Sequence, residues 1–226
     1  SGCQEMNKWK GKYGPLLIAE IGGNHEGNFS YAKKLTKDAI TSGADVVKFQ
    51  LYSGDGIVNK KISPDRNLHF KKFQLTKDQH IELANMCKNA GVQYNASIWD
   101  PEMIHWVDKF QKFYKIGSGD LTAYPIILEF TKRGKPILLS TGLSSLQEVK
   151  ATVNFIKKSN SIYRKKNMIA VMQCTSMYPT DDTDVNLRVI DEFKKNFNLE
   201  IGYSHHSLGE LPLLTAYIKG ANILEF

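Results

Sequence analysis

Short apolar segments alternate with longer amphipathic segments along most of the chain. The short segments are rich in Ile, Val, Leu and aromatic residues and are bounded by polar or glycine positions, which is the pattern of buried parallel strands. Eight such segments predict strands at Leu16–Ile21, Val46–Gln50, Val92–Ser97, Phe113–Ile116, Pro136–Ser140, Ile169–Gln173, Leu199–Tyr203 and Asn222–Phe226.

The segments between these strands carry apolar residues at helical spacing. They predict helices at Tyr31–Ser42, Thr76–Ala90, Pro101–Lys109, Pro125–Arg133, Leu146–Lys158, Asn186–Asn196 and Glu210–Lys219. Thr76 is a favourable N-cap, and Gly43 and Gly91 follow helix ends. Strand–helix repeats with short links predict an α/β fold with a parallel sheet. Eight repeats favour a (β/α)8 TIM barrel over a doubly wound sheet.

Two features depart from a regular barrel pattern. The stretch from Leu51 to Gln74 is long for a strand–helix link, so we predict an active-site loop there, with a short hairpin as one option. The chain also ends after the eighth strand segment. We interpret residues 16–226 as one barrel domain truncated after strand eight, and residues 1–15 as an N-terminal extension.

Composition narrows the class of protein. A chain of 226 residues with 42% hydrophobic content can bury one large core, and no run of eighteen apolar residues predicts a membrane span. Cys3, Cys87 and Cys174 are odd in number and far apart, which favours reduced thiols and a cytoplasmic protein. The net charge of +7 is spread over short lysine pairs, so we expect no nucleic-acid partner, whereas an anionic small substrate fits.

Polar residues cluster at the C-terminal ends of the predicted strands, where barrel enzymes place their chemistry. These residues are Glu20, Lys48, Gln50, Ser97, Asp100, Lys115, Ser118, Asp120, Ser140, Thr141, Thr175, Ser176, Tyr178, Ser204 and His206. Two lysines, several hydroxyls and glycine-bordered turns on one rim predict an anionic ligand, with phosphate as first choice. For Lys48 an ion pair within the core is the alternative. The sequence has no P-loop, which argues against nucleotide hydrolysis.

Seven segments carry a resemblance to a known family. They are Ala19–Gly27, Val47–Gln50, Lys115–Asp120, Leu139–Gly142, Cys174–Pro179, Asp184–Arg188 and Gly202–Ser207. In order and spacing they resemble the sialic acid synthases, which include the N-acetylneuraminate, pseudaminic acid and legionaminic acid synthases. The resemblance covers nearly the whole chain.

The resemblance implies a transferase reaction. Such a synthase condenses phosphoenolpyruvate with the open-chain aldehyde of an N-acetylated hexosamine, either N-acetylmannosamine or a diacetamido-hexose, and releases phosphate with a nine-carbon ulosonic acid. A divalent metal would polarise the aldehyde oxygen. No lysine Schiff base is needed, which separates this chemistry from that of the class I aldolases.

Residue roles follow from the same resemblance. It implies that phosphoenolpyruvate is held by Lys48, Lys115, Ser140, Ser176 and Ser204, with Ser118 as a further substrate-binding residue. Gln50 and Tyr178 would place the sugar, while Glu20 and Asp120 would be the acidic groups at the reacting centre, with Glu20 handling water or a proton. His206 would be one of two histidines that bind a divalent ion, with Mn²⁺ as first choice and Mg²⁺ or Co²⁺ as alternatives. The full-length protein would be a homodimer.

The sequence departs from the family pattern at two places. The family has Ser-Asp-His where this chain has Ser204-His205-His206, and its second metal histidine would directly follow Phe226. The C-terminal antifreeze-like domain of the family would also lie beyond Phe226. We therefore expect this chain to be a weak or inactive catalyst.

Two other functions are kept as alternatives. The first is a degenerate barrel that binds a sugar or a phosphorylated ligand without turnover. The second is another phosphoenolpyruvate-dependent synthase, making a seven- or eight-carbon keto acid. Those enzymes carry a cysteine metal ligand in their first loops, whereas this chain has none between Glu20 and His25.

Overall fold

The computed structural model describes residues 8–226, so Cys3 and the first part of the predicted N-terminal extension lie outside the described residues. The chain divides into two compact units. The first unit contains residues 116–226 and the segment that ends at Leu17, and the second contains Ile18–Lys115. Strand β2 (Gly14–Gly22) runs from the first unit into the second, and β5 (Tyr114–Ile116) runs from the second into the first.

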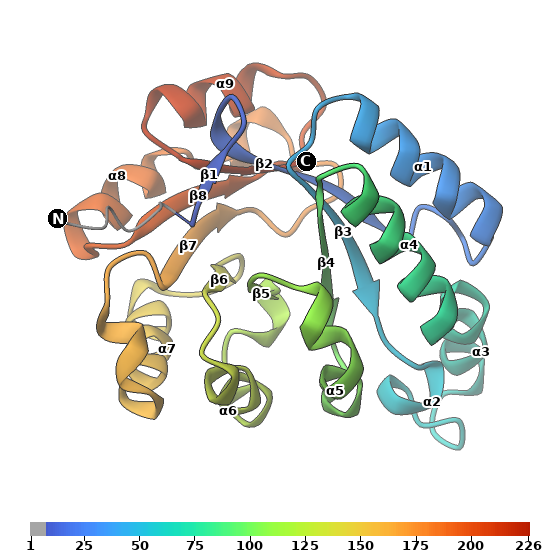
Figure 1. Ribbon diagram of the computed structural model, residues 1–226. Helices are drawn as coiled ribbons and strands as arrows, with labels where there is room; N and C mark the ends of the chain where they lie inside the picture. Colours follow the sequence, from blue (N-terminus) through green and yellow to red (C-terminus); the bar gives the residue numbers. More distant parts are fainter. Residues whose placement is uncertain (1–7) are drawn as a thin grey trace, which may run out of the picture. The chain divides into compact units, whose positions relative to one another are not determined.

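Parallel strands form the centre of the second unit. The later part of β2 pairs with β3 (Val46–Leu51), and β3 pairs with β4 (Gln93–Ile98). Helices α1 (Phe29–Thr41) and α4 (Lys77–Asn89) pack on each other and against β3 and β4, and they run side by side in Figure 1.

Local sequence signals explain where these helices begin. The side chain of Asn28 accepts a hydrogen bond from Tyr31 N at the start of α1. Thr76 and Gln79 form a reciprocal capping box at the start of α4, as the N-cap threonine predicts. The predicted helix at 101–109 is broken into three short turns instead: η1 (Pro101–Met103), α5 (Ile104–Val107) and η2 (Asp108–Phe110).

The segment between β3 and α4 differs from the prediction, because it forms two helices and no hairpin. These are α2 (Gly54–Ile57) and α3 (Pro64–Phe73). Pro at the first helical position and lysines in the last turn favour α3, although its apolar residues follow no clear helical stripe. The buried Asn67 ties the two helices together, since its Nδ2 donates to Gly54 O at 3.0 Å and to Val58 O at 2.8 Å.

The first unit is built on a second set of parallel strands. β6 (Ile137–Ser140), β7 (Ile169–Cys174), β8 (Glu200–Ser204) and β9 (Ile223–Glu225) pair in this order. The helices of this unit are α6 (Tyr124–Arg133), α7 (Leu146–Ser159), α8 (Arg188–Asn196) and α9 (Leu211–Ile218), with single turns η3 (Ser118–Asp120), η4 (Ser161–Arg164) and η5 (Asp182–Asp184). α6 and α7 pack on one another and are neighbours in Figure 1.

The start of the described chain is folded into the first unit. β1 (Lys10–Gly11) forms an antiparallel pair with the first residues of β2, an element that the apolar pattern did not predict. The buried Trp9 donates from Nε1 to Asn167 O at 2.8 Å. The eight predicted strands are all present, each with ends within two residues of the prediction.

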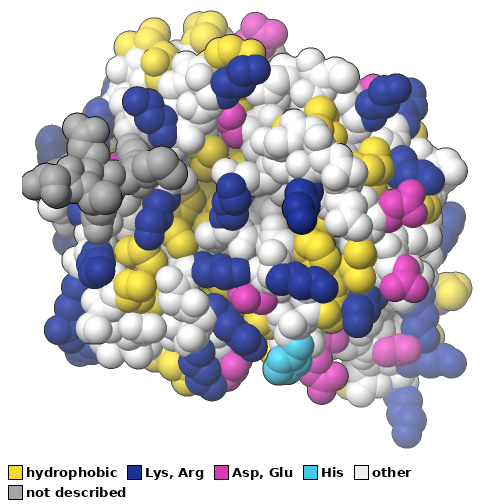
Figure 2. All heavy atoms as spheres, in the orientation of Figure 1, with side chains coloured by type: hydrophobic (Ala, Val, Ile, Leu, Met, Phe, Trp, Pro, Cys, Tyr) yellow, Lys and Arg dark blue, Asp and Glu magenta, His cyan; other side chains and the backbone are white. Residues whose placement is uncertain are grey.

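The surface carries positive charge without one continuous stripe in view. On the face in Figure 2, Lys and Arg side chains are spread out, with Asp and Glu side chains between several of them. Within residues 8–226, no helix has both the length and the apolar character needed to cross a membrane.

Candidate functional site

The C-terminal ends of the strands in the second unit bring a carboxylate and a lysine together. Glu20, Lys48 and Asn95 are register partners on β2, β3 and β4. Lys48 Nζ forms an ion pair with the Glu20 carboxylate and donates to Ser97 Oγ at 3.3 Å. Only 4% of Lys48 is exposed, so this charge lies inside the protein, where it needs such partners. The ion pair that stood as the alternative for Lys48 is therefore formed, and its partner is the predicted catalytic residue Glu20.

Gly22 leaves room for two predicted site residues. Its φ is +53°, and a Cβ atom added there would lie 2.9 Å from Glu20 Oε1 and 3.5 Å from Gln50 Nε2. The Glu20 and Gln50 side chains therefore meet above this glycine. Any larger residue at position 22 would displace the Glu20 carboxylate and would also strain the backbone.

The other predicted lysine of the second unit, Lys115, is also buried, with 5% of its surface exposed. It lies on β5, directly after a segment that is bonded to β4 through side chains. Asn95 Nδ2 donates to Phe113 O at 2.8 Å, and Ala96 N donates to Gln111 Oε1 at 2.8 Å. These bonds fix the chain that leads into Lys115.

In the first unit, two predicted hydroxyls meet at one glycine. Gly142 N, just after β6, donates to Ser118 Oγ at 3.0 Å. A Cβ atom at Gly142 would lie 2.4 Å from Ser176 Oγ and 2.8 Å from Ser118 Oγ, so only glycine lets both hydroxyls approach this backbone. Ser118, Gly142 and Ser176 are called the Gly142 cluster below. Ser140 is buried at the end of β6, two residues before this glycine.

A second group in the first unit joins a carboxylate, a hydroxyl and an imidazole. Ser204 and Glu225 are register partners on β8 and β9, and Ser204 Oγ donates to Glu225 Oε1 at 2.9 Å. His206 Nε2 lies 3.3 Å from the same Ser204 oxygen. Because that hydroxyl gives its proton to Glu225, the His206 contact requires a proton on Nε2. The ring of the exposed Tyr178 stands 4.4 Å from the His206 ring, centroid to centroid.

His205 faces a different neighbour from His206. Its backbone N donates to Glu225 O at 2.8 Å, and its Nδ1 lies 3.4 Å from the Tyr203 hydroxyl. The His205 ring therefore contacts Tyr203, while the His206 ring contacts Tyr178.

Asp120, the other predicted acid, lies in the turn η3, where burial raises the pKa of its carboxyl. A carboxyl with a raised pKa keeps its proton to higher pH than an exposed aspartate does, which suits a group that handles protons. Its Oδ2 lies near Gly117 on the same turn.

Sequence reasoning missed Glu225. Its side chain is buried, with 4% exposed, at the C-terminal end of β9. The available signal was the same as for Glu20, namely an acidic residue that directly ends an apolar strand segment. Within the described part of the chain, no group of three or more His, Cys, Asp or Glu side chains could hold a metal ion. The described side chains, the predicted ligand His206 included, therefore do not make a complete metal site.

Comparison with known proteins finds relatives that cover nearly the whole chain. Human N-acetylneuraminate-9-phosphate synthase is 32% identical over 232 residues, covering 96% of this chain and 63% of the relative. N,N'-diacetyllegionaminic acid synthase of Legionella pneumophila is 32% identical over 225 residues, covering 93% of this chain and 62% of the relative. The chain thus spans less than two thirds of the length of these relatives.

The crystal structure of N-acetylneuraminic acid synthetase from Leptospira borgpetersenii, in complex with citrate, superimposes with a TM-score of 0.84 at 27% identity. The match covers 94% of this chain and 72% of that chain. It confirms the (β/α)8 class that the strand pattern predicts. Residues 35–226 match the NeuB family. The chain therefore belongs to the NeuB family.

Proposed function

We propose that this protein is a transferase that condenses phosphoenolpyruvate with an N-acetylated hexosamine, adds water and releases phosphate. Membership of the NeuB family supports the reaction class, since the relatives are named as synthases of N-acetylneuraminate 9-phosphate and of diacetyllegionaminic acid. The observation in this chain that best supports the proposal is the Gly142 cluster. The two serine hydroxyls lie so close to Gly142 that they leave no space for a side chain at this position.

The Gly142 cluster has the chemistry of a phosphate site. Two hydroxyls meet at one point, and phosphate oxygens accept hydrogen bonds from hydroxyls. Ser118 Oγ accepts from Gly142 N, which leaves its own proton to donate to a phosphate oxygen. Ser140 and Ser204, both buried at strand ends, are proposed as further hydroxyl donors to phosphoenolpyruvate.

The second unit holds two buried lysines, which can bind an anion. Phosphoenolpyruvate carries a carboxylate and a phosphate, so Lys48 and Lys115 are proposed to balance its charge. Gln50, which meets Glu20 above Gly22, and Tyr178 are proposed to hold the sugar.

In the proposed first step, the methylene carbon of phosphoenolpyruvate bonds to the aldehyde carbon while the π bonds of the enol and of the aldehyde break, and the aldehyde oxygen takes up a proton. Water then adds to the carbon that bears the phosphate and passes one proton to Glu20. When the bond from this carbon to the phosphate oxygen breaks, the added oxygen forms the new carbonyl, and its second proton leaves with the phosphate. Glu20 is held by Lys48, and Asp120, with its raised pKa, is proposed to give the proton to the former aldehyde oxygen.

A divalent ion is proposed to bind with His206 as one of its ligands, and Mn²⁺ is the first choice for this ion. When bound it would polarise the aldehyde oxygen. The described residues alone do not complete such a site, so the steps above are assigned only to side chains of the chain.

Counting carbon atoms relates each possible product to its hexosamine acceptor. Phosphoenolpyruvate gives three of the nine carbons, so carbon 9 of the product was carbon 6 of the hexosamine. A synthase of a 9-phosphate therefore takes a 6-phosphorylated sugar, whereas a synthase of diacetyllegionaminic acid takes a diacetamido-hexose. N-acetylmannosamine, its 6-phosphate and the diacetamido-hexoses are all candidates for this protein.

The test is phosphate release from phosphoenolpyruvate with Mn²⁺ by this chain together with its native downstream sequence, because the chain alone is expected to be a weak or inactive catalyst. Each candidate sugar is offered separately, and the product is identified by mass spectrometry. We expect release with one sugar, loss of release with a chelator, and a nine-carbon acid as product. Binding of phosphoenolpyruvate without release for any sugar would refute the synthase proposal and support a barrel that binds without turnover.

A further inference from the structure

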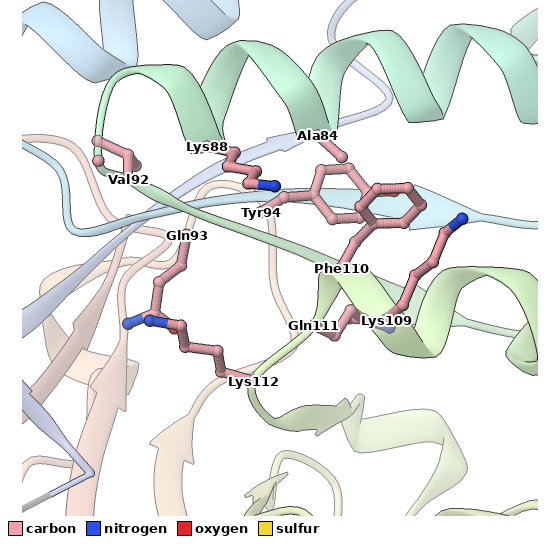
Figure 3. Close-up of a pocket in the computed structure, with 10 residues that line it drawn as sticks. Ala84, Lys88, Val92, Gln93, Tyr94, Lys109, Phe110, Gln111 and Lys112 are labelled. Carbon is pink, nitrogen blue, oxygen red and sulfur yellow. The ribbon is translucent and has the colours of Figure 1, made fainter.

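A cavity of about 540 Å³ lies in the second unit, at the N-terminal end of β4. Its walls come from the last turns of α4, the start of β4 and the turn η2 (Figure 3). Ser97, which contacts Lys48, is near the other end of this strand. It lies four positions after Gln93, which at roughly 3.3 Å per residue places the cavity about 13 Å from the Lys48–Ser97 contact. The cavity is thus separate from the groups assigned above.

The lining of this cavity is basic. Lys88, Lys109 and Lys112 line it, and none of its lining residues is an aspartate or a glutamate. In Figure 3, Lys88 points from α4 toward the Tyr94 and Phe110 rings, and Lys112 and Gln93 point toward each other at the opposite side. Three ammonium groups around one hollow favour an anion, and Gln93 adds an amide that can both donate and accept.

One wall of the cavity is aromatic and firmly held. Phe110 and Tyr94 meet edge to face, with centroids 6.5 Å apart. Tyr94 is fixed from behind, because its hydroxyl bonds His80 Nδ1 at 2.8 Å and its ring stacks on Phe49 at 5.5 Å. Lys109 Nζ lies 5.0 Å from the Phe110 ring centroid. Phe110, which is half-buried, therefore offers a ring surface next to a positive charge.

We propose that this cavity binds a mononucleotide. The base would lie against Phe110, and the phosphate would bind Lys88 and Lys112. The volume is within the range of pockets that hold ligands of this size, roughly 300–1,000 Å³. A ligand with both a ring and a phosphate uses the aromatic wall and the lysines together, whereas inorganic phosphate or a neutral ring uses only one of them. Binding here leaves the Lys48–Ser97 end of β4 open, so the nucleotide is proposed as a second ligand and not as a substrate of the synthase reaction.

The test is calorimetric titration of the purified protein with AMP, compared with adenosine and with inorganic phosphate. We expect AMP to bind more tightly than either fragment and to bind unchanged when phosphoenolpyruvate is saturating. The double variant Lys88→Ala, Lys112→Ala should weaken AMP binding by at least about tenfold, because charge-assisted bonds to phosphate are lost. Phe110→Leu should weaken the binding of AMP and leave that of inorganic phosphate unchanged.

The matched control is Lys60→Ala, Lys61→Ala, which removes the same charge from the segment between α2 and α3. It should leave AMP affinity unchanged. Three results would each overturn the proposal: no AMP binding at millimolar concentration, an equal loss in the control variant, or displacement of AMP by phosphoenolpyruvate. None of these measurements depends on turnover, so the nucleotide site and the synthase reaction can be refuted independently.

Discussion

Replacing Gly142 by alanine tests the proposed phosphate site most directly. The new Cβ atom would lie 2.4 Å from Ser176 Oγ, 2.8 Å from Ser118 Oγ and 3.1 Å from Cys174 O. Ordinary contact begins at 3.4 Å, so the Ser176 oxygen must retreat by 3.4 − 2.4 = 1.0 Å and the Ser118 oxygen by 3.4 − 2.8 = 0.6 Å. Both hydroxyls therefore leave their positions.

These contacts imply that Gly142→Ala lowers the free energy of unfolding. Overpacking of this kind costs about 1–3 kcal/mol. The hydrogen bond from Gly142 N to Ser118 Oγ contributes about 1 kcal/mol when intact and is weakened by the shift. We expect the free energy of unfolding to fall by about 2 kcal/mol, which leaves a domain of this size folded.

The same substitution should weaken the binding of phosphoenolpyruvate by more than it lowers the free energy of unfolding. Two hydrogen bonds to a charged phosphate contribute about 1.5 kcal/mol each, so their loss amounts to about 3 kcal/mol. At about 1.4 kcal/mol per factor of ten, the Kd for phosphoenolpyruvate should rise by about 100-fold. Calorimetric titration with phosphoenolpyruvate measures this Kd, and urea unfolding of the same samples measures stability.

Gly119→Ala is the matched control. Gly119 is exposed and follows Ser118 directly, but a Cβ atom there would meet nothing within 4 Å. This variant should keep both its stability and its affinity. If Gly142→Ala binds phosphoenolpyruvate as well as the unchanged protein, or if Gly119→Ala loses as much affinity, the Gly142 cluster is not the phosphate site.

Three further predictions concern stability, each measured by urea unfolding. Glu20→Gln leaves the buried Lys48 charge without its carboxylate and should cost about 3 kcal/mol, whereas Glu26→Gln on the surface should cost almost nothing; equal losses would contradict the role of the pair. Burial lowers the pKa of His80 from 6.5 to about 4, so stability should be full above pH 6.5 and fall by up to about 3 kcal/mol toward pH 4. His80→Gln should lack this pH-dependent loss, and an unchanged pH profile in that variant would assign the loss to other groups. Thr76→Ala removes the capping acceptor of Gln79 N and should cost about 1 kcal/mol, while no change would mean that water replaces the cap.

The strands, and the polar residues that end them, could be predicted from the sequence for one physical reason. Buried parallel strands need continuous apolar runs, so a polar residue that ends such a run stands out. Glu20 and Lys48 were found in this way, and register pairing brings them together. The glycines next to predicted site residues were also visible, and the structure explains Gly142 by the space that two hydroxyls occupy.

The features that were missed depend on contacts between distant parts of the chain. Trp9 is buried against Asn167, a contact that no local pattern could reveal. Helix α3 has clear end signals but no apolar stripe, so periodicity did not detect it. Lys88 and Lys112 belong to no pattern in the sequence, and only the fold places them around one cavity.

Two side-chain hydrogen bonds connect β4 to the segment before β5, and they should affect local opening of the second unit. Along the described chain, β4 forms its backbone ladder with β3, and its other edge bonds Phe113 and Gln111 through side-chain amides. A hydrogen bond to a side-chain amide can break on its own when the side chain rotates, whereas the backbone hydrogen bonds of a strand pair break cooperatively. Solvent should therefore reach the backbone proton of Ala96 through small fluctuations, long before it reaches the centre of β3. We therefore expect this edge of β4 to exchange its amide protons before the β3–β4 ladder does.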